Sequence, residues 1–389
     1  MLPPYKSGVN LQHFWYHDAP ISQERGYSSP SAAPHEGMSV RTVVVCAVQV
    51  PFVTGGAELH VRSLVAQLRT RGYRTEIVSL PFKWNPKEEI LTHAAAWRLI
   101  DLSESNGQAI DLVISTKFPS YFVRHPNKVA WLIHQYRAAY ELCGTKYSDF
   151  RHTEQDVGLR QTILDLDRET LGECRKLFAN AKNTAKRLAR YNGLTATPLY
   201  HPPPLADRLH GGEYGNYVLS VGRLESVKRI ELALEAMQYV DAPTHLVVVG
   251  DGSHRQDLEH RAATVGVSDR LTFLGQVDDT KLVELYAGAL AVVYAPFDED
   301  YGYVTLEAFL ARKPVVTASD SGGTLEFIED DVSGSVCQPN AEAIGSAINR
   351  LAADRSYAAS LGEAGYERAR QVTWDGVIEQ LVSHKDVGS

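Results

Sequence analysis

The chain has 389 residues, of which 44% are hydrophobic and 22% charged, and its formal net charge is -8 at pH 7. This length predicts about two domains, with one large barrel as the alternative. The composition excludes wholesale disorder, and the negative charge argues against a dedicated nucleic-acid binder. The four cysteines form no C-x-x-C pair, so we expect neither a zinc site nor a disulfide framework, and a reducing cytoplasm fits best.

The N-terminal stretch 1–37 is dense in Pro, Ser and Gly and shows no periodicity. This texture is typical of loop or disorder, so we predict a disordered or loosely docked extension and a folded part that begins at Met38. We expect no secretory signal and no transmembrane segment, because the sequence lacks the apolar runs that either requires.

The first folded segment is predicted to be a β-α-β unit. Residues 41–50 form an almost unbroken, β-branched apolar run, which is typical of a strand covered on both faces of a parallel sheet. A loop with Gly55 and Gly56 separates this strand from a helix over 58–71 and a strand over 75–80. The alternation continues with strands over 111–115, 128–133 and 177–180, and with helices over 153–172 and before Asn192.

The consecutive prolines at 202–204 cannot lie inside a helix or a central strand, so they predict a linker. We therefore expect one domain over 38–204 and a second over 205–372. The second domain repeats the pattern, with strands over 217–221, 245–249, 271–274, 290–294 and 314–317 and helices over 229–237 and 304–311. Open α/β sheets of this kind bind ligands beyond the carboxyl ends of their strands.

Two loops that follow strands carry residues suited to an anion. Gly55 and Gly56 let the backbone approach a ligand, and the helix behind them offers free N–H groups; a tight structural turn explains the same pair equally well. In the loop 222–229, Arg223 and Lys228 can converge on one diphosphate, because a guanidinium offers two parallel donors and an ammonium a point charge. Two solvated surface cations are the alternative.

The segment 296–308 places Glu299 in a loop and Glu307 in the following helix, so both carboxylates can face one cleft. Carboxylates accept strong hydrogen bonds and suit sugar and ribose hydroxyls, whereas the alternative is an acidic surface. Gly302 permits close backbone approach, and the helix start adds N–H donors for a phosphate. A fourth loop, 319–326, again joins a Gly-Gly turn to an acidic residue.

Together these loops form a motif series: G-G-A-E, V-G-R-L-x-x-x-K, G-D-G, E-D-Y-G-Y-V-T-L-E-A and P-V-V-x-A-S-D-S-G-G-x-x-E. The series resembles that of the retaining glycosyltransferases of family four (glycosyl transferases group 1), over residues 41–385. The resemblance implies an α/β protein of the GT-B fold, with two Rossmann-like doubly wound domains facing across a cleft. It also implies a C-terminal helix, within 373–389, that crosses back to the first domain.

The resemblance assigns roles to individual residues. Gly56 would face the donor diphosphate, and Arg223 and Lys228 would neutralise it together with the leaving group. Glu299 would hold hydroxyls of the transferred sugar, and Glu307 those of the ribose. Further donor contacts are expected from Gly55, Gly222, Gly302, Tyr303 and Val304, with the segment 274–277 beside the nucleobase.

His134 follows the predicted strand 128–133 and matches the position of the family's active-site histidine, although a lone histidine is more often a structural hydrogen-bonding residue. We count it as a catalytic candidate with Arg223, Lys228 and Glu299. Side chains after neighbouring strands are either acceptor-side candidates or plain surface residues: Lys117, Tyr121, Arg124, Tyr136 and Arg137.

The implied reaction transfers a sugar from a nucleoside diphosphate to a hydroxyl of a glycan or a lipid-linked acceptor, with retention of configuration. Charge grows on the leaving diphosphate, so electrostatic stabilisation is the main catalytic requirement. A UDP-glucose-type donor is slightly favoured and GDP-mannose comes next, without a deciding residue. We expect no metal or cofactor: Asp298 and Asp300 form an Asp-x-Asp pattern, but protein cations already serve the diphosphate.

Three alternative functions are weighed against this one. A dinucleotide-dependent oxidoreductase is disfavoured, because 250–255 lacks the third glycine of G-x-G-x-x-G. Another GT-B enzyme, such as a nucleotide-sugar epimerase or a sugar phosphorylase, shares the fold but not the motif series. A non-enzymatic, two-lobed sugar-binding protein has no need of cations around a diphosphate.

One predicted helix and the residues before it are basic, at Lys176, Lys182, Lys186, Arg187 and Arg190. These residues form either a solvated face or a weak contact with an anionic membrane. We expect a cytoplasmic protein, with attachment to the inner face of the plasma membrane as the open alternative.

Overall fold

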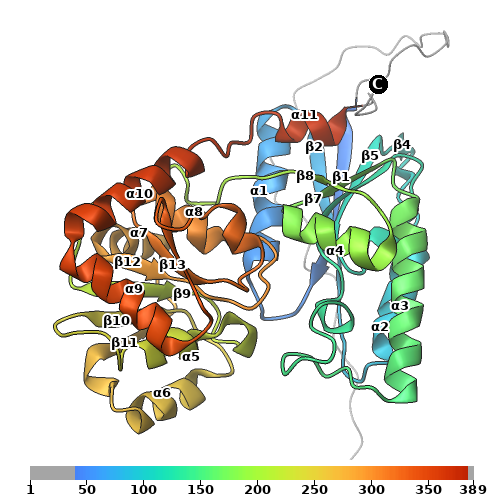
Figure 1. The fold of residues 1–389 in the computed structure, drawn as a ribbon. Coiled ribbons are helices and arrows are strands. Elements are labelled where there is room, and N and C mark those ends of the chain that lie inside the picture. The colour runs from blue at the N-terminus through green and yellow to red at the C-terminus, as the bar shows by residue number, and fades with distance from the viewer. Residues whose placement is uncertain (1–39, 384–389) are drawn as a thin grey trace, which may run out of the picture. The chain divides into compact units, whose positions relative to one another are not determined.

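The computed structural model describes residues 40–383, so the extension predicted over 1–37 lies outside the described residues. Two six-stranded parallel sheets form the body of this part, one built from the N-terminal and one from the C-terminal half of the chain (Figure 1). A small antiparallel ribbon of β3 (Glu104–Ser105) and β4 (Gln108–Ala109) is attached to the first half.

The first sheet has the strand order β2-β1-β5-β6-β7-β8. Its strands are β1 (Thr42–Gln49), β2 (Arg74–Pro81), β5 (Leu112–Lys117), β6 (Lys128–His134), β7 (Lys176–Ala179) and β8 (Thr197–Pro198). One face is covered by α1 (Gly56–Thr70) and α11 (Val377–Val382), and the other by α2 (Glu89–Arg98), α3 (Glu154–Gly172) and α4 (Lys182–Asn192). Because both faces are covered, residues 43–48 of β1 are all buried, as the unbroken apolar run predicts.

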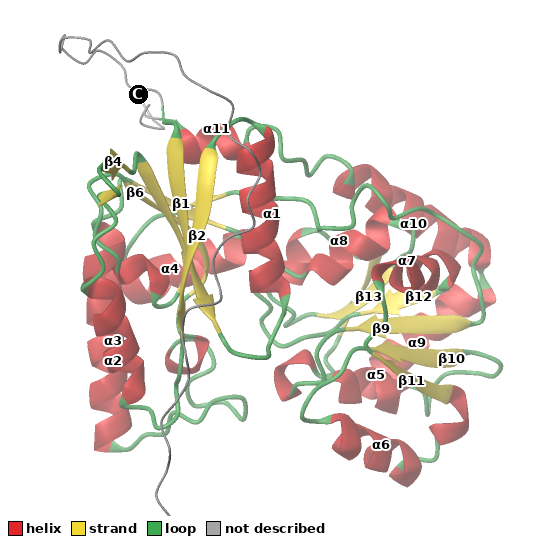
Figure 2. Cartoon of the chain, turned by 180° about the vertical axis from the view of Figure 1, so that it is seen from behind, coloured by secondary structure: helices red, strands yellow, loops and turns green. Residues whose placement is uncertain are grey.

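The second sheet has the order β11-β10-β9-β12-β13-β14. Its strands are β9 (Tyr217–Val221), β10 (His245–Val249), β11 (Leu271–Gly275), β12 (Ala291–Val293), β13 (Val315–Ala318) and β14 (Gly334–Cys337). Helices α5 (Ile230–Ala236), α6 (Arg255–Thr264) and α9 (Ala341–Ala353) cover one face, and α7 (Asp279–Gly288) and α8 (Tyr303–Leu310) the other. The helix α10 (Arg355–Ala369) contributes to both cores, and Figure 2 shows the helices on either side of the strands.

The strand order places the ligand-binding edge of each sheet. In the second sheet the order reverses between β9 and β12, and such a reversal opens a crevice beyond the carboxyl ends of the two strands. The loops after β9 and β12 carry Lys228 and Glu299. In the first sheet the order reverses between β1 and β5. The loop after β1 carries Gly55, and Lys117 is the last residue of β5.

The C-terminal helix returns to the first sheet. Figure 1 shows α11 beside α1 and the strands of the first sheet. Val377, Ile378 and Leu381 of α11 are buried in the core that surrounds β1 and α1. The Trp374 ring, just before α11, meets the Trp131 ring edge-on at 6.0 Å. The predicted GT-B arrangement of two doubly wound domains and a returning helix is therefore confirmed. The predicted linker over 202–204 lies between β8, the last strand of the first sheet, and β9, the first strand of the second.

The predicted basic face on α4 is only partly present. Lys182, Lys186 and Arg190 are exposed, but Lys176 and Arg187 are buried. Arg187 is turned inward because it forms ion pairs with carboxylates of both domains. The prediction of five solvated basic residues is therefore wrong for these two. Within residues 40–383, the helices are too short or too polar to cross a membrane.

Candidate active site

A cavity of about 610 Å³ opens between the loops at the carboxyl ends of the two sheets. It collects every residue proposed as catalytic or donor-binding and three of the acceptor-side candidates. These lining residues are Gly55, Gly56, Lys117, His134, Tyr136, Arg137, Gly222, Arg223, Lys228, Glu299, Gly302, Tyr303, Val304 and Glu307. Three other candidates do not line the cavity: Tyr121 is buried in the core, Arg124 is exposed, as its alternative of a plain surface residue predicts, and the segment 274–277 is absent from the lining.

Lys228 and Glu299 form an ion pair inside the cavity. Tyr294, which follows β12, donates a hydrogen bond to Glu299 Oε2 at 2.9 Å, and its hydroxyl lies 3.5 Å from Lys228 Nζ. Glu299 is 8% exposed. Burial opposes its ionisation, but the charges of Lys228 and Arg137 outweigh burial and hold the pKa of Glu299 below its usual range. The site therefore holds an ionised carboxylate beside an ammonium.

Two helix N-termini meet across the cavity. Gly302 caps α8 at φ 82°, and a Cβ there would lie 2.9 Å from Thr324 Oγ1, so a larger residue would be strained. The Tyr303 ring lies against Gly56 at the start of α1, 3.6 Å from where its Cβ would be. Helix N-termini present unpaired N–H groups and positive dipole ends, so this junction suits an anionic ligand.

The loop before α1 is fixed by Glu58, the acidic residue of the G-G-A-E motif, for which the motif series predicts no role. Glu58 accepts hydrogen bonds from Gly55 N and from Lys117 Nζ, each at 2.8 Å. A Cβ on Gly55 would lie 3.6 Å from both Glu58 Oε2 and Arg223 Nε, which places the exposed Arg223 beside this loop. Glu58 thus joins the turn to the end of β5 and neutralises Lys117.

Glu307 lies on α8 with 8% of its surface exposed, and it accepts a hydrogen bond from Tyr286 Oη at 2.7 Å. Burial raises the pKa of Glu307 to about 7. At neutral pH the carboxyl group is therefore divided between its charged and neutral forms. A diol that donates two hydrogen bonds would favour the charged form.

His134 is neutral at physiological pH. Its Nδ1 lies 2.7 Å from the Gln135 carbonyl oxygen, which can only accept, so Nδ1 carries the proton and Nε2 is an acceptor. Burial lowers the pKa of His134 to about 4, although the charge of Asp300 opposes this shift. The imidazole can accept a hydrogen bond from a sugar hydroxyl, but it is not a proton donor at neutral pH.

A charge cluster of Arg137, Glu141, Arg187, Asp298 and Asp300 holds the loop that carries Glu299. Arg187 of α4 lies 2.5 Å from Asp300 and 3.1 Å from Glu141, and Arg137 lies 2.5 Å from Glu141. Arg137 also donates to the Asp298 backbone oxygen at 2.6 Å. Burial opposes ionisation of Asp300, but Arg137 and Arg187 outweigh it and hold the Asp300 pKa well below its usual range.

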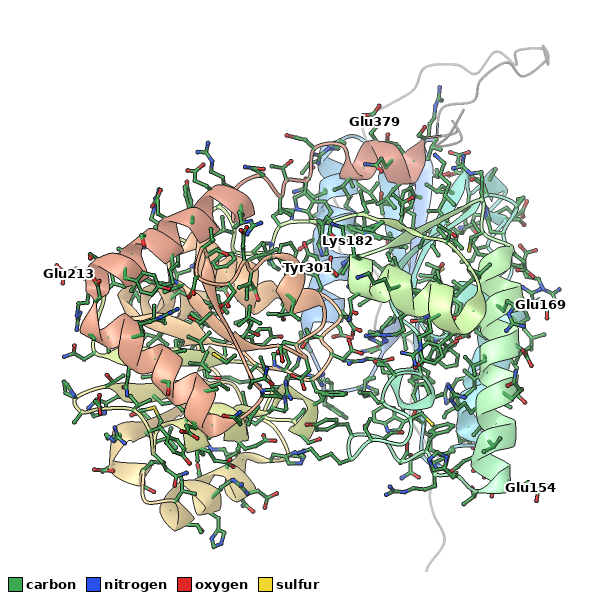
Figure 3. The ribbon with its side chains drawn as sticks, in the orientation of Figure 1. Glu154, Glu169, Lys182, Glu213, Tyr301 and Glu379 are labelled. Carbon is green, nitrogen blue, oxygen red and sulfur yellow. The ribbon has the colours of Figure 1, made fainter. Side chains whose placement is uncertain are left out.

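The acidic residue of the fourth loop has a structural role. Glu326 accepts hydrogen bonds from Lys182 N at 2.9 Å, Asn183 N at 2.6 Å and Tyr200 Oη at 2.6 Å. A carboxylate at a helix N-terminus is favourable, so Glu326 fastens α4 to the second domain instead of facing the cavity. Figure 3 labels Lys182 at the start of α4, and Tyr301 of the second domain.

Two doubly wound domains, with an anion-binding junction of helix termini, cations and carboxylates at their facing edges, define the GT-B class of sugar-transferring proteins. Residues 210–368 match the profile of the family described as glycosyl transferases group 1, and the family that the motif series predicts is confirmed over this part of the chain.

Named relatives agree with this placement. The chain is 31% identical over 170 residues to alpha-1,3/1,6-mannosyltransferase ALG2 of Homo sapiens, covering 40% of this chain and 41% of that protein. It is 23% identical over 377 residues to an uncharacterized glycosyltransferase of Methanocaldococcus jannaschii, covering 86% and 94%. The solved structure of Anabaena HepE with UDP and glucose has a TM-score of 0.63 at 17% identity and covers 88% of this chain and 98% of that one.

Proposed function

We propose that the protein transfers a sugar, with retention of configuration, from a nucleoside diphosphate to a hydroxyl of a glycan or lipid-linked acceptor. The observation that carries this proposal is the Lys228–Glu299 pair at the reversal point of the second sheet, beside the junction of α1 and α8. This arrangement offers a cation and helix N-termini to a diphosphate, and an ionised carboxylate to the hydroxyls of the adjoining sugar.

In this mechanism the protein stabilises a leaving group. Arg223, Lys228 and the N–H groups at Gly56 and Gly302 neutralise the charge that grows on the diphosphate. Glu299 orients the sugar and is not assigned the role of nucleophile; Lys228 and Tyr294 both contact its Oε2 and hold the carboxylate in place. The leaving phosphate takes the proton of the attacking hydroxyl on the same face, and retention follows from this geometry.

We propose further that the reaction needs no metal. Asp298 and Asp300 form the Asp-x-Asp pattern, yet both carboxylates already have partners in the first domain. Asn183 Nδ2 donates to Asp298 Oδ1 at 2.6 Å, and Arg187 pairs with Asp300 at 2.5 Å. A divalent cation would have to displace these groups, so the protein's own cations are the better partners of the diphosphate.

The identity of the donor is tested by measuring the release of UDP or GDP from a series of UDP-sugars and GDP-sugars. We favour a UDP-glucose-type donor first and GDP-mannose next. The Glu299→Ala variant should lower kcat/KM for the preferred donor by about 100-fold, as expected for loss of a preorganised polar group. The control is Glu213→Ala, an exposed glutamate labelled in Figure 3 and outside the cavity. Unchanged turnover in Glu299→Ala would refute the proposed site.

A further inference from the structure

The two cationic side chains that line the first-domain wall of the cavity are each paired with a carboxylate. Lys117 Nζ lies 2.8 Å from Glu58 Oε1, and the two side chains are 12% and 21% exposed. Arg137 is held by Glu141 at 2.5 Å and lies 3.6 Å from Asp300. Among the described residues of this wall, no other lysine or arginine lines the cavity. A phosphate bound here would have to separate an existing ion pair.

Four aromatic side chains form part of this wall. The Phe82 ring centroid lies 6.0 Å from that of Trp84, 5.7 Å from Phe118 and 5.9 Å from Tyr136, and all four residues line the cavity. Trp84 is 43% exposed. Aromatic side chains offer a large, rigid apolar surface, and Tyr and Trp add a polar edge. The wall therefore suits a flat ligand that carries both apolar and hydroxyl groups.

The apolar surface continues into the loop after β1, where Val53 lines the cavity and Phe52 lies outside it. Phe52 is fully exposed and Val53 is 39% exposed. This loop lies next to the one with Phe82, because Phe82 N donates to the Gln49 oxygen at 2.9 Å. Phe52 also adopts φ 65°, an uncommon conformation for a bulky residue, of the kind that concentrates at ligand-binding sites.

From this wall we infer the class of acceptor, an inference that rests on the proposed function. The acceptor is an uncharged sugar that bears an apolar aglycone. Its ring lies on Phe82 and Tyr136, its accepting hydroxyl points toward His134, and its aglycone extends over Trp84 to Phe52. The Lys117–Glu58 pair can then exchange hydrogen bonds with hydroxyl groups and still remain paired.

The test uses the full chain and the donor found by nucleotide release. Three acceptors are compared: a short-chain alkyl glucoside below its micelle concentration, free glucose, and glucose 1-phosphate. We expect the KM of the alkyl glucoside to be at least about tenfold lower than either of the others. Trp84→Ala should raise that KM about tenfold and leave the donor KM unchanged. Tyr239→Ala, an exposed aromatic residue outside the cavity, serves as the control and should change neither.

Binding of the alkyl glucoside is also followed by tryptophan fluorescence of wild type and Trp84→Phe, without any donor. This signal tests the acceptor class even if the screen finds no donor, an outcome that would count against the proposed function alone. Preference for glucose 1-phosphate, equal KM values for the three acceptors, or a fluorescence change independent of Trp84 would overturn the inference. It would also fall if Trp84→Ala kept its KM and lost only sedimentation with phosphatidylcholine vesicles, because the patch would then be a membrane contact.

Discussion

Replacing Arg187 by methionine removes the cation shared by two buried carboxylates. Arg187 is 5% exposed and lies 2.5 Å from Asp300 and 3.1 Å from Glu141. Methionine fills a similar volume but leaves both carboxylates with one fewer counter-charge. Removing one partner of a buried ion pair typically costs about 3–5 kcal/mol, because the other charge stays buried.

This cost converts to a measurable change in melting temperature. For domains of the size seen here, each 1 kcal/mol lowers Tm by roughly 2–4 °C, so Arg187→Met should melt about 6–20 °C below wild type. The difference should depend on pH. Burial alone would raise the pKa of Asp300, but the charges of Arg137 and Arg187 outweigh burial and lower it. The ionised Asp300 therefore stabilises the fold above the pKa of an unfolded aspartate, and this stabilisation is lost as pH falls. The gap between variant and wild type should therefore shrink in acid.

The measurement is thermal unfolding by circular dichroism at several pH values. Arg190→Met is the matched control, because Arg190 lies on the same helix and is exposed, and its Tm should stay within about 2 °C of wild type. The double variant Arg187→Met/Asp300→Asn should recover part of the loss, since it removes one of the two carboxylate charges that Arg137 alone would have to balance. A Tm for Arg187→Met equal to that of the control would refute the reasoning about the charge cluster.

Three further outcomes are expected. Because burial raises the pKa of Glu307 to about 7, the donor KM should rise as pH falls through 7. Tyr286→Phe removes a hydrogen bond that lowers this pKa, so the midpoint of the pH dependence of the donor KM should move to higher pH. An unchanged pH profile in Tyr286→Phe would contradict the role of Glu307. Activity should survive treatment with EDTA, and a loss restored by Mn²⁺ or Mg²⁺ would disprove metal independence. Gly302→Ala should cost about 1–3 kcal/mol and reduce turnover, because its Cβ would lie 2.9 Å from Thr324 Oγ1 at φ 82°; Gly158→Ala, in a helix interior with open space around it, should be neutral or stabilising in the same denaturant titration.

Local patterns predicted the strands well because both faces of each sheet are covered. The run 245–249 coincides with β10, and the run 41–50 contains β1. The candidate site was also accessible to sequence reasoning. Loops after parallel strands share one edge of a sheet, so Lys228 after β9 and Glu299 after β12 had to lie near each other.

Long-range pairing was not accessible in the same way. Arg187 and Asp300 are 113 residues apart, and nothing in the local sequence separates the buried Arg187 from the exposed Lys186 beside it. Glu326 shows the same limit, since its position after a Gly-Gly turn suggested a ligand contact. It caps α4 of the other domain instead, a role that depends on how the two sheets face each other.

The most direct measurement of the central claim, that a nucleoside diphosphate binds at Lys228, is calorimetric titration of UDP and of GDP into wild type and Lys228→Ala. Wild type should bind one of the two, and the variant should bind it about 10- to 100-fold more weakly, as expected for the loss of a charge-assisted contact. Free glucose and mannose should give no heat of binding. Equal affinity in the two proteins, or binding of a free sugar in place of the diphosphate, would contradict the account.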